Sequence, residues 1–86
     1  MNYEVKLHPT VDKFLNKLDN ELSARIKQRF NLLKDNPFRY LEHYEGEDCY
    51  KFRTGDYRAL IDVDTARKII FVRVLGHRSK IYKRQI

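Results

Sequence analysis

Apolar and polar side chains alternate near the start of the chain. Tyr3, Val5 and Leu7 are each separated by a polar residue. A period of two residues is typical of a strand that buries one face. The pattern therefore predicts a first strand over residues 2–7.

The apolar spacing changes to three and four residues after Pro9, which is the period of an amphipathic helix. The stripe of the first predicted helix consists of Val11, Phe14, Leu15 and Leu18. Asp19 or Asn20 can cap a second helix, and Pro37 ends it. The stripe of that helix consists of Leu22, Ile26, Phe30 and Leu33. The two helices should form a hairpin.

Residues 37–48 have no sustained period and end in an acidic cluster that contains a glycine. We expect a loop here, with Phe38 and Leu41 held against the core.

Three strand-like runs follow: Cys49–Thr54, Tyr57–Val63 and Lys68–Leu75. Gly55 and Asp56 join the first two runs, and a two-residue connection of this kind makes a tight hairpin. The order of elements is β-α-α-β-β-β. It predicts a single α+β domain over residues 1–86, with an antiparallel sheet and the N-terminal helical hairpin packed on one face.

A two-residue turn fixes the pairing of the strands that it joins. Arg53 should therefore lie opposite Arg58, and Lys51 and Leu60 should share their face of the sheet. The opposite face should cover the helices with Tyr50, Phe52, Tyr57, Ala59, Ile61 and Val63.

The turn between the second and third strand-like runs allows paired positions to be counted in the same way. If Val63 pairs with Lys68, then Arg73 lies opposite Arg58, and the side chains on the helix face are Ile70, Val72 and Val74. Arg53, Arg58 and Arg73 would form a row of like charges, which is unfavourable unless an anion binds there or carboxylates neutralise it. The candidate carboxylates are Asp56, Asp62 and the acidic residues of 45–48.

The charge is distributed unevenly along the chain. Residues 1–48 hold eight Lys or Arg and nine Asp or Glu, for a net charge of −1, whereas residues 49–86 hold ten Lys or Arg and three Asp, for a net charge of +7. Such a cationic half favours a polyanionic partner, nucleic acid first, because binding to phosphates releases counterions. A basic surface that serves solubility is the alternative.

Composition excludes several other classes of protein. Hydrophobic residues make up 42% and aromatic residues 13% of the 86 residues, which argues against a disordered chain. No segment reaches the ~20 apolar residues of a membrane span, and residues 1–4 do not resemble a signal peptide. The one cysteine, Cys49, excludes an internal disulfide. We expect a cytoplasmic protein that does not associate with membranes.

Two segments together carry a family resemblance. Residues 49–53 followed by Gly-Asp-Tyr-Arg at 55–58, and residues 74–78 (Val-Leu-Gly-His-Arg) followed by Ile81 and Tyr82, resemble the RelE branch of the RelE/ParE toxin superfamily. The resemblance extends over essentially the whole chain and agrees with the order of elements.

The resemblance implies the toxin of a type II toxin–antitoxin system: a ribosome-dependent endoribonuclease that cuts mRNA in the ribosomal A site and so inhibits translation. It implies attack by the 2′-hydroxyl without a metal or other cofactor. The catalytic residues that it implies are Lys51, Arg53, Arg58, Arg78 and Tyr82. Arg58 would hold the phosphate with Lys51 and Arg53 nearby, Arg78 would be the acid and Tyr82 the base. His77 is better suited to donate a proton at neutral pH than an arginine, so the choice between His77 and Arg78 stays open.

The same resemblance implies a RelB-like antitoxin that neutralises the toxin, and a complex that binds operator DNA through that antitoxin. Leu60, Ile69 and Phe71 would expose apolar surface on the cationic face, which residues 79–86 or the antitoxin would cover. The alternative function is that of the ParE branch, which inhibits gyrase without cleaving RNA. A non-catalytic RNA-binding module is less favoured, because the predicted strands lack paired exposed aromatic residues.

Overall fold

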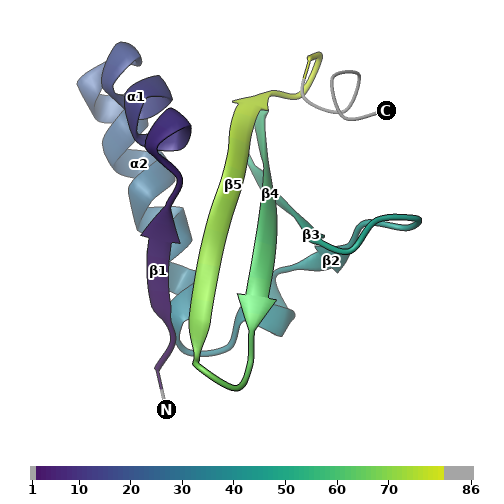
Figure 1. The fold of residues 1–86 in the computed structure, drawn as a ribbon. Helices are drawn as coiled ribbons and strands as arrows, with labels where there is room; N and C mark the ends of the chain where they lie inside the picture. Colours follow the sequence, from purple (N-terminus) through teal and green to yellow (C-terminus); the bar gives the residue numbers. More distant parts are fainter. Residues whose placement is uncertain (1, 81–86) are drawn as a thin grey trace.

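The predicted helices and strands occur in the predicted order, with one additional short strand (Figure 1). The structure is a computed structural model, and it describes residues 2–80. Its elements are β1 (Glu4–Leu7), α1 (Pro9–Lys17), α2 (Asn20–Asn31), the 3-10 helices η1 (Leu32–Lys34) and η2 (Pro37–Arg39), β2 (Glu42–His43), β3 (Tyr50–Thr54), β4 (Tyr57–Asp64) and β5 (Ile69–His77).

Each α-helix begins at a side-chain cap. His8 caps α1, because its Nδ1 accepts a hydrogen bond of 3.1 Å from the Thr10 N–H, and Pro9 stands in the first turn, where no N–H is needed. Asp19 caps α2 by accepting from the Leu22 N–H at 3.4 Å. Of the two predicted caps for α2, Asp19 is therefore the one used. No helix within residues 2–80 is long and apolar enough to cross a membrane.

The five strands form one sheet in the order β1-β5-β4-β3-β2. The expectation of a purely antiparallel sheet is wrong, because β1 pairs with β5 in parallel, with Glu4 opposite Ile69 and Leu7 opposite Val72. Tight turns force β3, β4 and β5 to be antiparallel. β1 is connected to them through the helices, so no turn sets its direction.

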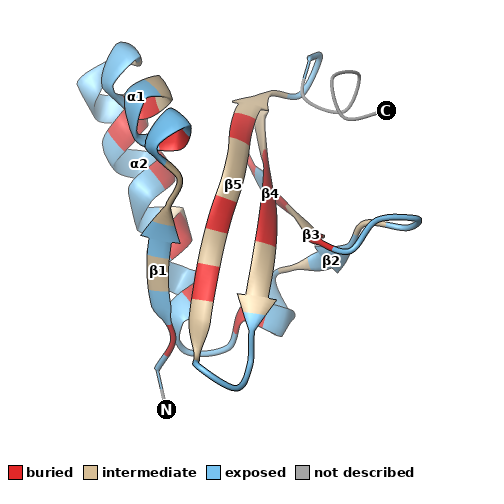
Figure 2. Ribbon diagram, viewed as in Figure 1, coloured by how far each residue is buried: buried red, intermediate tan, exposed pale blue. Residues whose placement is uncertain are grey.

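The helices cover one face of the sheet, and the main core lies between these two layers (Figure 2). The buried residues of this core are Tyr3, Val11, Leu15, Ile26, Phe30, Leu33, Phe52, Ala59, Ile61, Ile70, Val72 and Leu75. Leu41 packs against this core as predicted. Phe38 does not, since it is 45% exposed and its ring meets the edge of Tyr50 instead.

A second, smaller cluster lies on the other side of the sheet. It consists of buried Cys49 and Leu60 with Tyr44 and Val74 packed against them. The predicted apolar exposure of Leu60 is therefore wrong, because the segment between β2 and β3 covers it. The prediction that Val74 faces the helices is also wrong, and Leu75 occupies that side instead.

A bulge in the β4–β5 pairing, which follows a shifted turn, explains the displacement of Val74. Lys68 has a φ of 60° and is the one non-glycine residue with a positive φ in the described chain. It therefore belongs to the turn, so that pairing begins with Asp64 opposite Ile69 and the predicted Val63–Lys68 pair is wrong. A bulge follows, with Ile61 opposite Val72 but Leu60 opposite Val74. The extra residue is Arg73, and every side chain beyond it changes face.

Candidate functional site

The β3–β4 hairpin brings three cations onto the sheet face that is opposite the helices. Gly55 in its turn has a φ of 63°, which glycine adopts without strain. The pairing is the predicted one, with Arg53 opposite Arg58 and Lys51 opposite Leu60. Because Leu60 lies in the smaller cluster on that face, the side chains of Lys51, Arg53 and Arg58 point away from the helices.

These three cations line one open groove of about 400 Å³, whose other lining residues are Tyr40 and Glu42. Short β2 places Glu42 opposite Lys51 in the sheet, and their charged groups are 3.9 Å apart. The Lys51 ammonium also lies 5.4 Å from the ring centre of Tyr44. Three positive charges against one negative charge leave the groove with affinity for an anion.

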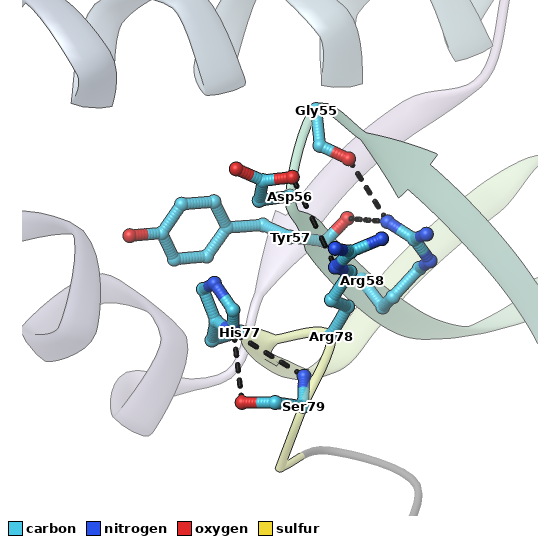
Figure 3. A network of polar contacts seen from close by, with 7 residues as sticks. All are labelled: Gly55, Asp56, Tyr57, Arg58, His77, Arg78 and Ser79. Carbon is cyan, nitrogen blue, oxygen red and sulfur yellow. Dashed lines mark hydrogen bonds and ion pairs between the residues drawn. The ribbon is translucent and has the colours of Figure 1, made fainter.

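The turn itself holds the guanidinium of Arg58 in place. Arg58 Nη1 donates to the carbonyl oxygens of Gly55, at 2.9 Å, and Tyr57, at 3.0 Å (Figure 3). Within residues 2–80 the other two guanidinium nitrogens make no hydrogen bond, and they remain available to a phosphate oxygen. Arg58 is thus pre-positioned on the edge of the groove.

Arg73 does not join this row, contrary to the sequence prediction. The bulge places Gly76, instead of Arg73, opposite Arg58. Arg73 Nη1 forms an ion pair of 3.1 Å with Asp62. One of the predicted carboxylates therefore neutralises the third arginine, whereas Arg53 and Arg58 remain adjacent like charges.

Arg78 continues the β5 side of the site. Its backbone N–H donates to the Asp56 carbonyl oxygen at 2.8 Å, and its Nε lies 4.0 Å from Asp56 Oδ1. Arg58 is opposite Gly76 in the sheet, and Arg78 is two residues further along the same chain. Arg78 lies in the turn that follows β5, and the close view shows its side chain, like that of Arg58, beside the β3–β4 turn (Figure 3).

His77 lies on the opposite face. It pairs with Tyr57 in the sheet, their ring centres are 5.6 Å apart, and Tyr57 in turn contacts Phe14 of α1. The Nδ1 of His77 accepts the Ser79 N–H at 3.2 Å and lies 2.9 Å from Ser79 Oγ. His77 is thus oriented by the turn that follows β5, and it faces away from Arg58.

Tyr82, the fifth predicted catalytic residue, lies outside the described residues. Of the other four, Lys51, Arg53 and Arg58 lie on β3 and β4 and line the groove. Arg78 lies in the turn after β5 and is not among the residues that line it. Tyr40 and Glu42 are lining residues that the sequence pattern does not indicate, because they belong to a stretch without a hydrophobic period.

The fold and the groove define a small α+β domain with a helical pair on one face of its sheet and a groove lined by Lys51, Arg53 and Arg58 on the other. Its sequence matches the family model of the ParE toxin of type II toxin–antitoxin systems over residues 5–82. The chain belongs to this family of toxins. No significant match was found among curated proteins.

Similar solved structures indicate the branch of the superfamily to which the chain is related. The RelBE2 toxin–antitoxin complex from Mycobacterium tuberculosis contains a chain that is 25% identical, with a TM-score of 0.79 over 91% of this chain and 100% of that one. The RelE–RelB complex from Pyrococcus horikoshii OT3 contains a chain that is 28% identical, with a TM-score of 0.76 over 94% of this chain and 100% of that one. The free form of a variant of the E. coli toxin RelE, at 21% identity, has the same fold, with a TM-score of 0.71 over 100% of both chains. The likenesses to the Mycobacterium tuberculosis and Pyrococcus horikoshii chains confirm the predicted resemblance to the RelE branch of the RelE/ParE superfamily.

Proposed function

We propose that this toxin is a ribosome-dependent endoribonuclease that cuts mRNA in the ribosomal A site. The observation that supports it most is the groove in which Lys51, Arg53 and Arg58 meet. Arg78 is held beside the β3–β4 turn through its contacts with Asp56. Each of these side chains carries a positive charge at neutral pH, and together they fit the non-bridging oxygens of one phosphodiester.

The proposed reaction uses the RNA as its own nucleophile. The 2′-oxygen attacks the adjacent phosphorus, the new O–P bond closes a cyclic phosphate, and the bond to the 5′-oxygen of the next nucleotide breaks. The 2′-hydroxyl proton passes to a base, and the departing 5′-oxygen takes a proton from an acid. DNA lacks the 2′-hydroxyl, so the reaction is specific for RNA.

Each side chain has a role in this proposal. Arg58 and Arg53 bind the phosphate and stabilise the charge that grows on it, and Lys51 adds to that field. Tyr82 is the proposed base; a tyrosine is mostly protonated at neutral pH, so nearby cations must favour its phenolate. Arg78 is the proposed acid, because His77 faces the helices. The lining is mainly cationic, which suits phosphate and gives a metal ion one carboxylate, that of Glu42.

We also propose a RelB-like antitoxin as the partner that neutralises the toxin. The solved chains from Mycobacterium tuberculosis and Pyrococcus horikoshii OT3 come from complexes with such antitoxins. The complex would bind operator DNA through the antitoxin. Since the ribosomes on which such a toxin acts are cytoplasmic, we propose that compartment for it.

Gyrase inhibition without RNA cleavage is the second candidate. The description of the matching family, the ParE toxin of a parDE system, favours it. A purely inhibitory toxin, however, does not require arginines gathered around an anion groove.

One pair of assays separates the two candidates. Primer extension on mRNA bound to programmed ribosomes, with and without the protein, should show new 5′ ends at A-site codons. A supercoiling assay with purified gyrase should show no inhibition at the same protein concentration. Inhibition of gyrase together with intact mRNA would reject the proposed nuclease.

A further inference from the structure

Three aromatic residues lie close together in the segment before β3, and the structure gives each a different environment. The ring of Phe38 contacts Tyr50 at 5.5 Å between centres. Tyr44 packs on the smaller cluster below Lys51. Tyr40 is 38% exposed, lines the cationic groove, and makes no aromatic or cation–π contact within residues 2–80.

The backbone under Tyr40 is firmly held. Its N–H donates to the Pro37 carbonyl oxygen at 3.0 Å, and the Leu41 N–H donates to the same oxygen at 3.1 Å. Pro37 is buried, and Leu41 packs against the main core. Two residues further on, Glu42 pairs with Lys51 in the sheet. The ring is thus carried by a short rigid segment that is anchored on both sides.

An exposed aromatic ring that a rigid backbone segment holds beside cations is an arrangement by which proteins bind single-stranded nucleic acid. The cations hold the backbone phosphates, and the ring stacks on a base that has left its neighbours. A base next to the bound phosphate has to lie beside this groove, since the sugar–phosphate backbone joins the two.

We propose that Tyr40 is a nucleobase-binding residue, which stacks on a base of the mRNA next to the phosphate held by Arg58. This inference rests on the proposed nuclease function and deepens it. Stacking fixes the nucleotide beside the scissile bond, so that the 2′-oxygen is held in line with the bond that breaks. It also makes the toxin sensitive to the identity of that base, because purines offer more stacking surface than pyrimidines.

The test combines protein variants with mRNA that lacks single bases. Cleavage is measured as kcat/KM on ribosomes with an empty A site, programmed with mRNA that carries one abasic nucleotide at each position around the cut in turn. Tyr40→Ala should lower kcat/KM on intact mRNA by about 5- to 150-fold, the range of losing one stacked base. Tyr40→Phe keeps the ring and should cleave nearly as well as the unsubstituted protein.

The decisive comparison is the coupling between the two changes. At one mRNA position, removing the base should slow the unsubstituted protein by the same factor as Tyr40→Ala, and should slow Tyr40→Ala no further. Phe38→Ala is the matched control, because Phe38 is another exposed aromatic residue of this segment and does not line the groove. It should behave like the unsubstituted protein on every mRNA.

Each other outcome counts against the inference. If Tyr40→Ala, folded by circular dichroism, cleaves normally, Tyr40 binds no base. If it is impaired equally on intact and on every abasic mRNA, its partner is ribosomal RNA or protein instead. Weaker binding of an antitoxin with normal cleavage would assign Tyr40 to that interface. If the unsubstituted protein cuts no mRNA at all, the proposed function fails, and this inference fails with it.

Discussion

Arg53 and Arg58 lie directly opposite each other across the β3–β4 hairpin. Two like charges in this position destabilise a hairpin. Here, hydrogen bonds from arginine side chains to backbone carbonyl oxygens stabilise it. Arg58 donates to the carbonyl oxygens of Gly55 and Tyr57, and Arg29 of α2 donates to the Arg53 carbonyl oxygen at 3.1 Å. A bound phosphate would relieve the repulsion between the two guanidinium groups.

We expect Arg58→Ala to lower mRNA cleavage by about 10²- to 10³-fold, the usual effect of removing one group that stabilises charge in a transition state. Growth arrest on expression in cells should be lost as well. Primer extension on programmed ribosomes measures the first effect, and circular dichroism shows whether the fold is kept.

Arg73→Ala is the control for this variant. It also removes an arginine from the same face, but one that is paired with Asp62 away from the groove. It should cleave like the unsubstituted protein. Full toxicity of Arg58→Ala, or an equal loss in both variants, would contradict the site.

Arg53→Thr should stabilise the free protein while it weakens cleavage. Removing one charge of the opposed pair relieves about 0.2–1 kcal/mol of cross-strand repulsion, and threonine suits an exposed strand position. Thermal unfolding at low ionic strength measures the gain. The gain should shrink with added salt, which screens the repulsion; a gain that is independent of salt would point to another cause.

Tyr82→Phe should reduce cleavage by about 10²- to 10⁴-fold, the range for loss of a general base. The ring is kept and only the hydroxyl is lost, so binding to programmed ribosomes should change little. Single-turnover cleavage and ribosome binding should be measured on the same preparation. An unchanged rate would remove Tyr82 from the mechanism.

His77 is expected to act through the turn that follows β5, and two substitutions separate its possible roles. Asn keeps an acceptor for the Ser79 N–H, whereas Phe keeps the ring contact with Tyr57 but has no acceptor. His77→Asn should therefore retain most cleavage activity, and His77→Phe should lose more. A strong loss in both variants, with an altered pH profile in His77→Asn, would show that His77 is itself the proton donor.

Burial raises the pKa of the Cys49 thiol, although the nearby Arg73 acts in the opposite direction. The folded protein therefore holds its thiol proton at pH values where the unfolded chain has lost it. The contribution of the Cys49 thiol to the free energy of unfolding is fully present below the pKa of the unfolded thiol. It decreases as the pH rises through that value. Urea unfolding between pH 7 and 10 should show this decrease, and Cys49→Ala should lack this part of it. An identical pH dependence in both proteins would contradict the effect.

Local sequence signals predict the β3–β4 hairpin correctly because its turn allows one pairing. Gly55 and Asp56 connect two strands directly, so the positions of Lys51, Arg53 and Arg58 follow from counting. The helices follow from their apolar period and their caps in the same way. The three cations of the proposed groove can therefore be placed from the amino-acid sequence by itself.

The rest depends on backbone conformations that the sequence does not mark. A positive φ is uncommon for a lysine such as Lys68, and no glycine marks the bulge at Arg73. Together they move Arg73 out of the row, and the bulge exchanges Val74 for Leu75 in the core. Tyr40 escapes prediction for a different reason: its place in the groove depends on the two-residue strand β2, which is too short to have a recognisable period.

The parallel pairing of β1 with β5 affects how this protein is made. The first strand to be synthesised finds its only neighbour in the last described strand, and that strand also separates it from β4. A nascent chain cannot complete this sheet before β5 is synthesised, since β1 has no partner until then. Until β5 emerges from the ribosome, the toxin being translated therefore lacks the strand that joins β1 to the rest of the sheet.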